Sequence, residues 1–230
     1  MIQIQKNYIF IYQHMGLGDH IMCNGLVRTI IDKENQYIMF VKEHNYGSVS
    51  YMYRDIPNLR FLIGDDAAAI NFLNANAVPQ NQVKLIGFNW VDPTNHNLEE
   101  NFYMQHQIDP HKKWDSFYCE RDEQAEQKVY EHFSINEDYI FVHDDSRYHI
   151  DESKLPQGLR IIRPQIGVVD SIFCYAKVME KAKQLHLMES CFGWMAELMK
   201  LNPELYMHRY SRNPSKFETP TYRNVKEIYT

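Results

Sequence analysis

Near the N-terminus, an apolar run is followed at once by glycines, an acid and histidines. The run covers residues 8–12, and residues 14–21 then read HMGLGDHI. A β-strand that ends in a Gly-rich turn and opens a helix is a common place for an α/β protein to expose backbone N–H groups to an anion or a substrate. Gly16 and Gly18 permit a tight turn and close backbone approach, and Asp19 lies where a carboxylate can cap a helix. This turn is therefore the first candidate for a substrate-binding site.

Two histidines flank this turn, and an arginine follows it. His14 and His20 each offer a general base or a group that orients an acceptor. Arg28 lies late in the expected helix, where a substrate contact and a role at the helix C-terminus are both open. The stretch GLGDHI has no third glycine where G-x-G-x-x-G would need one, which disfavours a dinucleotide-dependent enzyme.

A second polar cluster ends the apolar strand expected at residues 138–143. It begins with His143 and includes Ser146 and Arg147, and we count all three as candidate ligand-binding residues. Ligands bind beyond the carboxyl ends of strands in open α/β sheets. The hydroxyl of Ser146 and the guanidinium of Arg147 could hold a phosphate. An Asp-rich turn with a solvated arginine is the competing interpretation.

A third candidate is the strand-turn-helix at residues 184–200. Ser190 is a good N-cap whatever the function. The apolar residues that follow at helical spacing indicate a core-facing helix rather than a cofactor site. Glu189, at the carboxyl end of the strand, is not explained by capping, so we count it with Ser190 as a candidate ligand-binding residue.

Apolar runs alternate with amphipathic segments along most of the chain, which predicts βα units that form parallel sheets. We expect strands at residues 8–12, 37–41, 59–63, 83–88, 138–143, 159–162, 184–188 and 205–209. We expect helices at residues 20–32, 46–54, 65–74, 122–133, 171–183 and 190–200.

The alternation stops and then restarts, which predicts two domains. Residues 91–118 lose their periodicity and carry Asp-Pro pairs, so we expect irregular structure there and a domain boundary near residues 110–121. The predicted division is an N-terminal domain at 1–115, a C-terminal domain at 116–212 and a tail at 213–230. The basic and aromatic stretch that begins at Arg209 could contact a polymeric acceptor, and a packed or disordered tail is the alternative.

Composition limits the class of protein. The 230 residues are 44% hydrophobic and 23% charged, with a formal net charge of −6. Such a charge argues against a surface built to hold nucleic acid and leaves a small charged substrate easy to accommodate. No targeting segment and no run near the roughly 20 apolar residues of a membrane span are visible. We therefore expect a soluble, intracellular, cytoplasmic protein.

No metal centre is expected. The four cysteines stand far apart, without the paired spacing of a zinc site or the density of a disulfide-stapled domain. Asp144 and Asp145 are the nearest approach to a cation-binding pair, and a plain turn at the end of a strand explains them as well.

The motifs resemble those of the heptosyltransferase-like GT-B glycosyltransferases. Gly-Leu-Gly-Asp followed by a helix that leads to Arg28 resembles the opening loop of that group, and the resemblance implies that Asp19 is the general base. The stretch from Glu189 resembles the late strand-turn-helix that meets the nucleotide-sugar, with Glu189 and Ser190 in the first two places. Cys191 stands where the family usually has glycine and Trp194 where it usually has histidine, so the sequence departs from the family at both.

The resemblance implies an α/β fold with two small Rossmann-like domains whose parallel sheets face each other across a cleft. It implies a glycosyltransferase that moves a sugar from a nucleotide-sugar to a hydroxyl acceptor, such as a glycan or a lipid-linked group, with inversion and without a metal or other cofactor. The N-terminal domain would take the acceptor, with Asp19 or His20 as base, and the C-terminal domain the donor. The open alternatives are a non-catalytic module that binds a nucleotide or sugar phosphate, and a different α/β enzyme.

Overall fold

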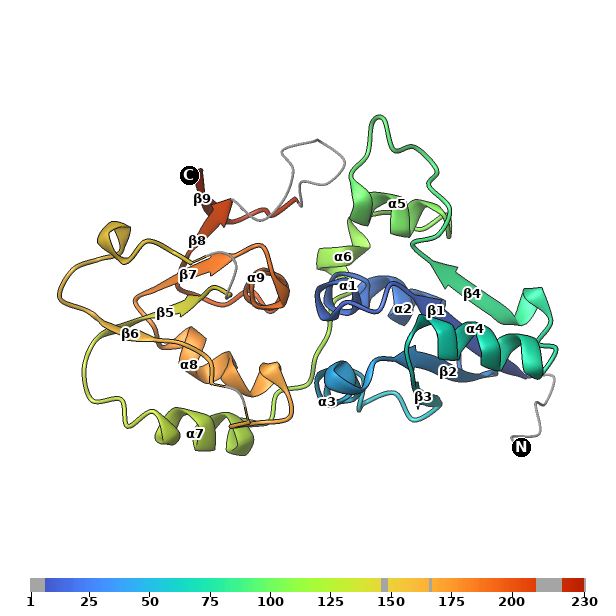
Figure 1. Ribbon diagram of the computed structural model, residues 1–230, viewed down its shortest axis with the longest axis horizontal. Helices are drawn as coiled ribbons and strands as arrows, with labels where there is room; N and C mark the ends of the chain where they lie inside the picture. The colour runs from blue at the N-terminus through green and yellow to red at the C-terminus, as the bar shows by residue number, and fades with distance from the viewer. Residues whose placement is uncertain (1–6, 146–148, 166, 210–220, 230) are drawn as a thin grey trace. The chain divides into compact units, whose positions relative to one another are not determined.

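The computed structural model describes residues 7–145, 149–165, 167–209 and 221–229. The chain divides into two compact units, Met1–Glu120 and Arg121–Thr230. The division falls inside the region 110–121, where the sequence pattern places the domain boundary. Each unit is an α/β unit with one sheet, and each is described by itself below (Figure 1).

The first unit contains a parallel sheet of four strands in the order β3-β2-β1-β4. Its strands are β1 (Tyr8–Gln13), β2 (Gln36–Val41), β3 (Leu59–Ile63) and β4 (Val83–Ile86). Most residues of β1 and β2 are buried. Parallel sheets are covered on both faces, so their strands appear in sequence as continuous apolar runs rather than alternating ones, and this is why the strand prediction at residues 8–12 and 37–41 is confirmed.

The helices of the first unit differ from the prediction in two places. They are α1 (Leu17–Met22), α2 (Asn24–Ile30), α3 (Glu43–Met52), α4 (Asp66–Ala75), α5 (Leu98–Met104) and α6 (Lys112–Asp115), with a short 3₁₀ turn at Gln80–Gln82. The single helix predicted at 20–32 begins earlier and divides at Cys23. The region 91–118, predicted as irregular, contains α5 and α6. Asn97 and Glu100 form a capping box that starts α5, a signal that the neighbouring Asp-Pro pairs obscured.

The second unit contains a parallel sheet of five strands in the order β6-β5-β7-β8-β9. Its strands are β5 (Tyr139–His143), β6 (Arg160–Ile162), β7 (Gln184–Met188), β8 (Glu204–Arg209) and β9 (Val225–Tyr229). Its helices are α7 (Glu123–His132), α8 (Ala176–Glu180) and α9 (Cys191–Leu198), with 3₁₀ turns at Glu152–Lys154 and Ile172–Tyr175.

Strand β9 differs from the prediction, which gives a tail at residues 213–230. It is the edge strand of the second sheet, and ion pairs tie it to β8. Lys226 Nζ lies 2.6 Å from Glu204 Oε1, and Arg209 Nη2 lies 2.5 Å from Glu227 Oε1. Two of its five residues are charged, so the segment has a weak apolar signal and depends on its neighbour strand for pairing.

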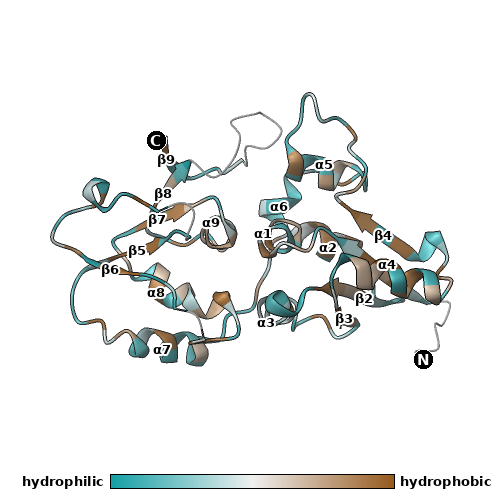
Figure 2. Cartoon of the chain, viewed as in Figure 1, coloured by the Kyte–Doolittle hydropathy of each residue, from teal (hydrophilic) through white to brown (hydrophobic). Residues whose placement is uncertain are grey.

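Hydropathy follows this architecture. Figure 2 shows β4 and β7 in brown and the surface helix α7 largely in teal. In the second unit β5 is buried at Tyr139, Ile140, Phe141 and Val142. Among the described residues, no helix is both long enough and apolar enough to cross a membrane.

Each sheet changes the direction of its strand order at its first strand. In the first sheet β2 lies on one side of β1 and β4 on the other; in the second, β6 lies on one side of β5 and β7 on the other. Open α/β sheets bind their ligands outside the carboxyl ends of the strands at such a switch point. The fold therefore identifies two places to examine, the ends of β1 and β4 and the ends of β5 and β7.

Candidate functional site

The Gly-rich turn lies at the switch point of the first sheet, where β1 leads into α1. Gly16 is the N-cap of α1, with ordinary extended dihedrals (φ −74°, ψ 141°). Asp19 is the third residue of α1, and its Oδ2 would lie only 2.6 Å from a Cβ placed on Gly16. Glycine is therefore needed at position 16 so that the carboxylate can fold back over the helix start, where the helix dipole favours negative charge.

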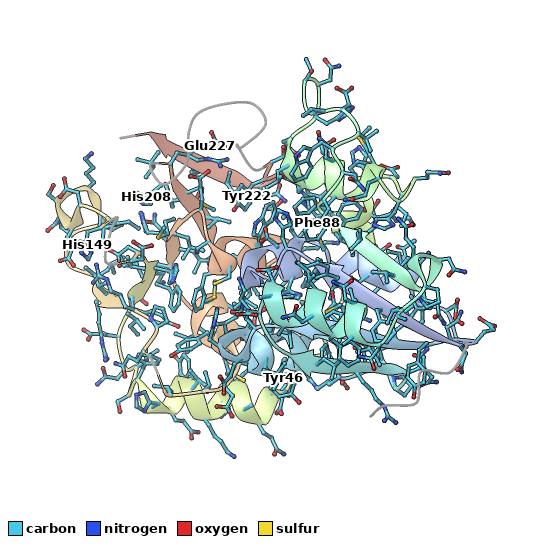
Figure 3. All side chains as sticks on the ribbon, turned by 45° about the vertical axis from the view of Figure 1, so that its right-hand side comes forward. Tyr46, Phe88, His149, His208, Tyr222 and Glu227 are labelled. Carbon is cyan, nitrogen blue, oxygen red and sulfur yellow. The ribbon has the colours of Figure 1, made fainter. Side chains whose placement is uncertain are left out.

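Aromatic side chains surround His14 beside this turn. The His14 ring meets Phe88 and Phe102 edge-on, with centroids 5.3 and 5.2 Å apart. Phe88, labelled in Figure 3, is 39% exposed, and Trp90 is 40% exposed. Gly87, with φ +93°, permits this approach, because a Cβ there would lie 2.9 Å from His14 Cδ2. The end of β4 thus adds exposed rings to the switch point that carries Asp19.

His20 is fully buried and does not suit the role of a base. Its Nδ1 contacts Gln13 Nε2, while Nε2 has no hydrogen-bond partner. Burial, with a smaller contribution from Lys42, lowers the pKa of His20 to about 3. A neutral, buried ring packs and orients the start of α1 but cannot reach a substrate hydroxyl. The catalytic prediction for His20 is therefore wrong, and Asp19 and His14 remain as candidates for the base.

The other two predicted substrate contacts of this unit have structural positions. Gly18 is the second residue of α1. Arg28 forms a bidentate pair with Asp55, both distances being 2.8 Å, and donates to the carbonyl oxygens of Met52 and Tyr118. The guanidinium therefore links α2 to the segments that carry these three residues, and this structural role accounts for Arg28 without a substrate contact.

The first unit also contains a buried ion pair that the sequence pattern does not predict. Lys113 Nζ lies 3.1 Å from Glu99 Oε1, and the two side chains are only 2% and 4% exposed. Burial raises the pKa of the Cys23 thiol well above its usual value, and the charges of Asp19 and Glu99 add to this while Lys113 opposes it. Both partners of the pair come from the region predicted as irregular, so no helical pattern pointed to them.

At the switch point of the second sheet, two predicted residues meet. His143 ends β5, Ser190 follows β7, and Ser190 Oγ lies 3.0 Å from His143 Nδ1. Ser190 holds the N-cap position of α9, but its side chain makes no cap hydrogen bond. The His143 ring packs on Phe192 of α9, with centroids 4.5 Å apart. Burial lowers the pKa of His143 to about 4, so the ring is neutral at pH 7.

Glu189 forms a buried ion pair with Arg209, the last residue of β8. Its Oε1 accepts a hydrogen bond from Arg209 Nη1 at 2.6 Å, and the two side chains are 3% and 6% exposed. Arg209 also pairs with Glu227 of β9. Arg209 is thus buried at the end of β8 rather than displayed in a basic tail, and the Glu189 carboxylate, predicted to contact a donor, is neutralised inside the protein.

The C-terminal segment packs on α9 where the sequence departs from the family it resembles. The Trp194 and Tyr222 rings stack with centroids 4.5 Å apart, and the backbone N–H of Arg223 donates to Glu197 at 2.7 Å. Tyr222 and Glu227 are both labelled in Figure 3. Burial raises the pKa of the Cys191 thiol to about 11, so this thiol is protonated at pH 7.

Ser146 and Arg147, the predicted phosphate contacts, lie outside the described residues. Of the neighbouring acids, Asp144 accepts from the backbone N–H of Ile150 at 3.0 Å and lies 3.4 Å from Arg163 Nε. Within the described part of the chain, no group of three or more His, Cys, Asp or Glu side chains could hold a metal ion.

Two buried histidines, His20 and His186, and the half-buried His143 make stability depend on pH. His20 has a pKa of about 3, and burial lowers that of His143 and His186 to about 4. An unfolded histidine titrates near pH ~6.5, so the unfolded chain takes up protons first as the pH falls. The stabilisation is complete above pH ~6.5 and is lost as the pH decreases towards 4, at up to about 1.4 kcal/mol per pH unit for each group.

We therefore expect the free energy of unfolding, measured with urea, to fall between pH 6.5 and 4.5. The variant His20→Gln should lower the slope in that window, whatever its effect on stability at pH 7. A wild-type profile that is flat over this range would contradict the assignment of these rings as neutral and buried.

No protein-family model matches the sequence, and no curated protein matches it. Among solved structures, the chain is similar to a glycosyl transferase of family 9 from Veillonella parvula DSM 2008, with a TM-score of 0.63 and 11% identity over 100% of this chain and 88% of that one. It is also similar to E. coli heptosyltransferase WaaC with ADP (TM-score 0.47, 11% identity, 90% and 88% covered) and with ADP-2-deoxy-2-fluoro heptose (0.42, 12%, 97% and 92%). The first likeness shows the fold, and it confirms the predicted fold class, an α/β chain with two Rossmann-like parallel sheets.

Proposed function

We propose that the chain is a glycosyltransferase that moves a sugar from a nucleotide-sugar to a hydroxyl acceptor. One observation carries the proposal: each unit places a complementary chemical group at the switch point of its sheet. The first unit presents the Asp19 carboxylate, and the second presents the start of α9 with Ser190 and His143. A base for an acceptor hydroxyl and an anion-binding helix end are the two requirements of this reaction.

The donor diphosphate belongs at the start of α9 in this proposal. The first-turn N–H groups receive no cap from Ser190, and the helix dipole favours negative charge there. Glu189 stands directly before this helix, but Arg209 neutralises its carboxylate. The local charge therefore does not repel a phosphate, and no metal is needed to stabilise the leaving group.

The acceptor belongs near Asp19, on the first unit. The carboxylate takes the proton of the acceptor hydroxyl while its oxygen attacks the anomeric carbon of the donor. The bond from that carbon to the phosphate oxygen breaks on the opposite face, so the configuration inverts and the nucleoside diphosphate leaves with its negative charge held at α9. Residues 1–115 then serve the acceptor and residues 116–212 the donor, as the resemblance implies.

Donor binding is tested with a panel of UDP-, GDP-, ADP- and CMP-sugars against NAD, measured by thermal shift and calorimetry. We expect one nucleotide class to bind and NAD not to bind. Ser190→Ala should raise the dissociation constant about tenfold or more, since a hydrogen bond to a charged group contributes about 1.5–3 kcal/mol. Ser50→Ala, which removes a hydroxyl that bonds only within α3, is the control. Tight NAD binding, or equal affinity in Ser190→Ala, would contradict the assignment.

A non-catalytic module that binds nucleotides is the second candidate. The stack of Tyr222 on Trp194 and the engagement of Glu189 by Arg209 favour it, because these positions would otherwise be open to a donor sugar. Binding without any turnover of the nucleotide-sugar would select this candidate over the transferase.

A further inference from the structure

The hydroxyl of Ser190 occupies an N-cap position without acting as a cap. A serine there usually accepts a hydrogen bond from the backbone N–H of the second or third helical residue. In this chain the Ser190 side chain makes no such bond and instead lies 3.0 Å from His143 Nδ1. The hydroxyl therefore bridges the ends of β5 and β7, in front of the uncapped first turn of α9.

The direction of this hydrogen bond decides what the hydroxyl can do for a ligand. A hydroxyl has one proton to donate, whereas an imidazole nitrogen donates or accepts according to the tautomer. If Ser190 donates to Nδ1, only its lone pairs remain, and they repel an anion. If Nδ1–H donates to Ser190 Oγ, the hydroxyl proton remains available to a phosphate oxygen, which can only accept.

The packing of His143 keeps its ring beside the Ser190 hydroxyl. The ring packs on Phe192, which belongs to the first turn of α9. Burial keeps the ring uncharged at neutral pH, against a smaller opposite effect of Asp144 and Asp145. At pH 7 the ring therefore acts through its tautomer and not through a positive charge.

We infer that His143 is a positioning residue for phosphate: its Nδ1–H donates to Ser190 Oγ and directs the serine proton to an anion at the start of α9. The inference rests on the proposed function, because the anion is the diphosphate of the nucleotide-sugar. His143 itself makes no contact with the donor, which changes the donor-binding role that the sequence suggested for it.

The first test is a set of dissociation constants for inorganic pyrophosphate and for UDP, GDP and ADP. His143→Asn places an amide N–H close to the position of Nδ1, because both nitrogens are bonded to Cγ, and it should keep the affinity within about threefold of wild type. His143→Leu should weaken binding about as much as Ser190→Ala, by about tenfold or more. The double variant should lose no more than either single one. His132→Leu, which removes an exposed histidine bonded to Gln165, is the matched control.

The second test reads the tautomer directly. In ¹⁵N-labelled protein, we expect the His143 Nδ1 resonance to take the protonated, pyrrole-like shift when pyrophosphate or a nucleoside diphosphate is bound. A packing role alone would not produce that change or the rescue by asparagine.

The outcomes separate the inference from the proposed function. An Nδ1 that stays unprotonated in the complex, or additive losses in the double variant, overturns the inference even if sugar transfer is detected. If the expected tautomer is found but the nucleotide-sugar is not turned over, the inference is supported and the proposed glycosyltransferase activity is overturned. If neither pyrophosphate nor any nucleotide binds the wild type, the inference is overturned together with the donor site.

Discussion

The variant Asp19→Asn is expected to transfer sugar about 10²–10⁴-fold more slowly than the wild type, the usual contribution of general acid–base catalysis. Asparagine has nearly the same shape as aspartate but cannot take the proton of the acceptor hydroxyl. The space over Gly16 that holds the carboxylate also fits an amide. The fold and the affinity for the donor should therefore stay near those of the wild type, and the loss should appear in the rate of transfer.

A purely structural role for Asp19 leads to a different result. Asp19 lies in the first turn of α1, where a carboxylate stabilises the helix by about 0.3–1 kcal/mol through its dipole. If that were its whole role, Asp19→Asn would lower the melting temperature slightly and leave the rate within a few-fold of wild type. Asp65→Asn is a suitable control, because Asp65 caps α4 by accepting from the Ala68 N–H and lies outside the proposed machinery.

The second large effect is on stability. Arg209→Met is expected to destabilise the second unit by about 3–5 kcal/mol, because it removes the guanidinium that compensates the charge of the buried Glu189 carboxylate. The double variant Arg209→Met with Glu189→Met should recover most of the loss, since an apolar pair replaces a buried ion pair at little cost. Urea unfolding measures both.

An exposed ion pair between β8 and β9 of the same sheet provides the comparison. Lys226 and Glu204 are 57% and 54% exposed, and Lys226→Met should cost at most about 1 kcal/mol. If Arg209→Met cost as little as Lys226→Met, the Glu189 carboxylate would have to be solvated, and the buried ion pair would be refuted.

The strands and the candidate turns were accessible from the sequence because each depends on local pattern. Residues 139–143 form the apolar run that a buried parallel strand requires. The residue types and spacing of Gly16 and Asp19 indicate a turn that leads into a helix. The strand at Val225–Tyr229 was not accessible, because it is an edge strand with a weak apolar signal and depends on pairing with β8.

The contacts within the second site could not be predicted because they depend on strand order. His143 and Ser190 are 47 residues apart, and Glu189 and Arg209 are 20 apart. Each pair meets only because β7 lies between β5 and β8. The sequence placed all four residues at strand ends, but nothing in it said which ends are neighbours. The burial of His20 could not be predicted either, because its helical neighbours Asp19 and Leu17 are partly exposed and no apolar pattern marks this face of α1 as buried.

The central claim is that the chain releases a nucleoside diphosphate by transferring the sugar of a nucleotide-sugar, with Asp19 as the base. The most direct measurement follows the anomeric proton of the donor that binds best by ¹H NMR, with wild-type protein and Asp19→Asn side by side. We expect the wild type to convert the donor, by transfer to an acceptor or by slow hydrolysis, to a product of inverted anomeric configuration, and Asp19→Asn to bind the donor and leave it intact. Equal conversion by both proteins, or a donor that stays intact in the wild type although it is bound, would contradict this account.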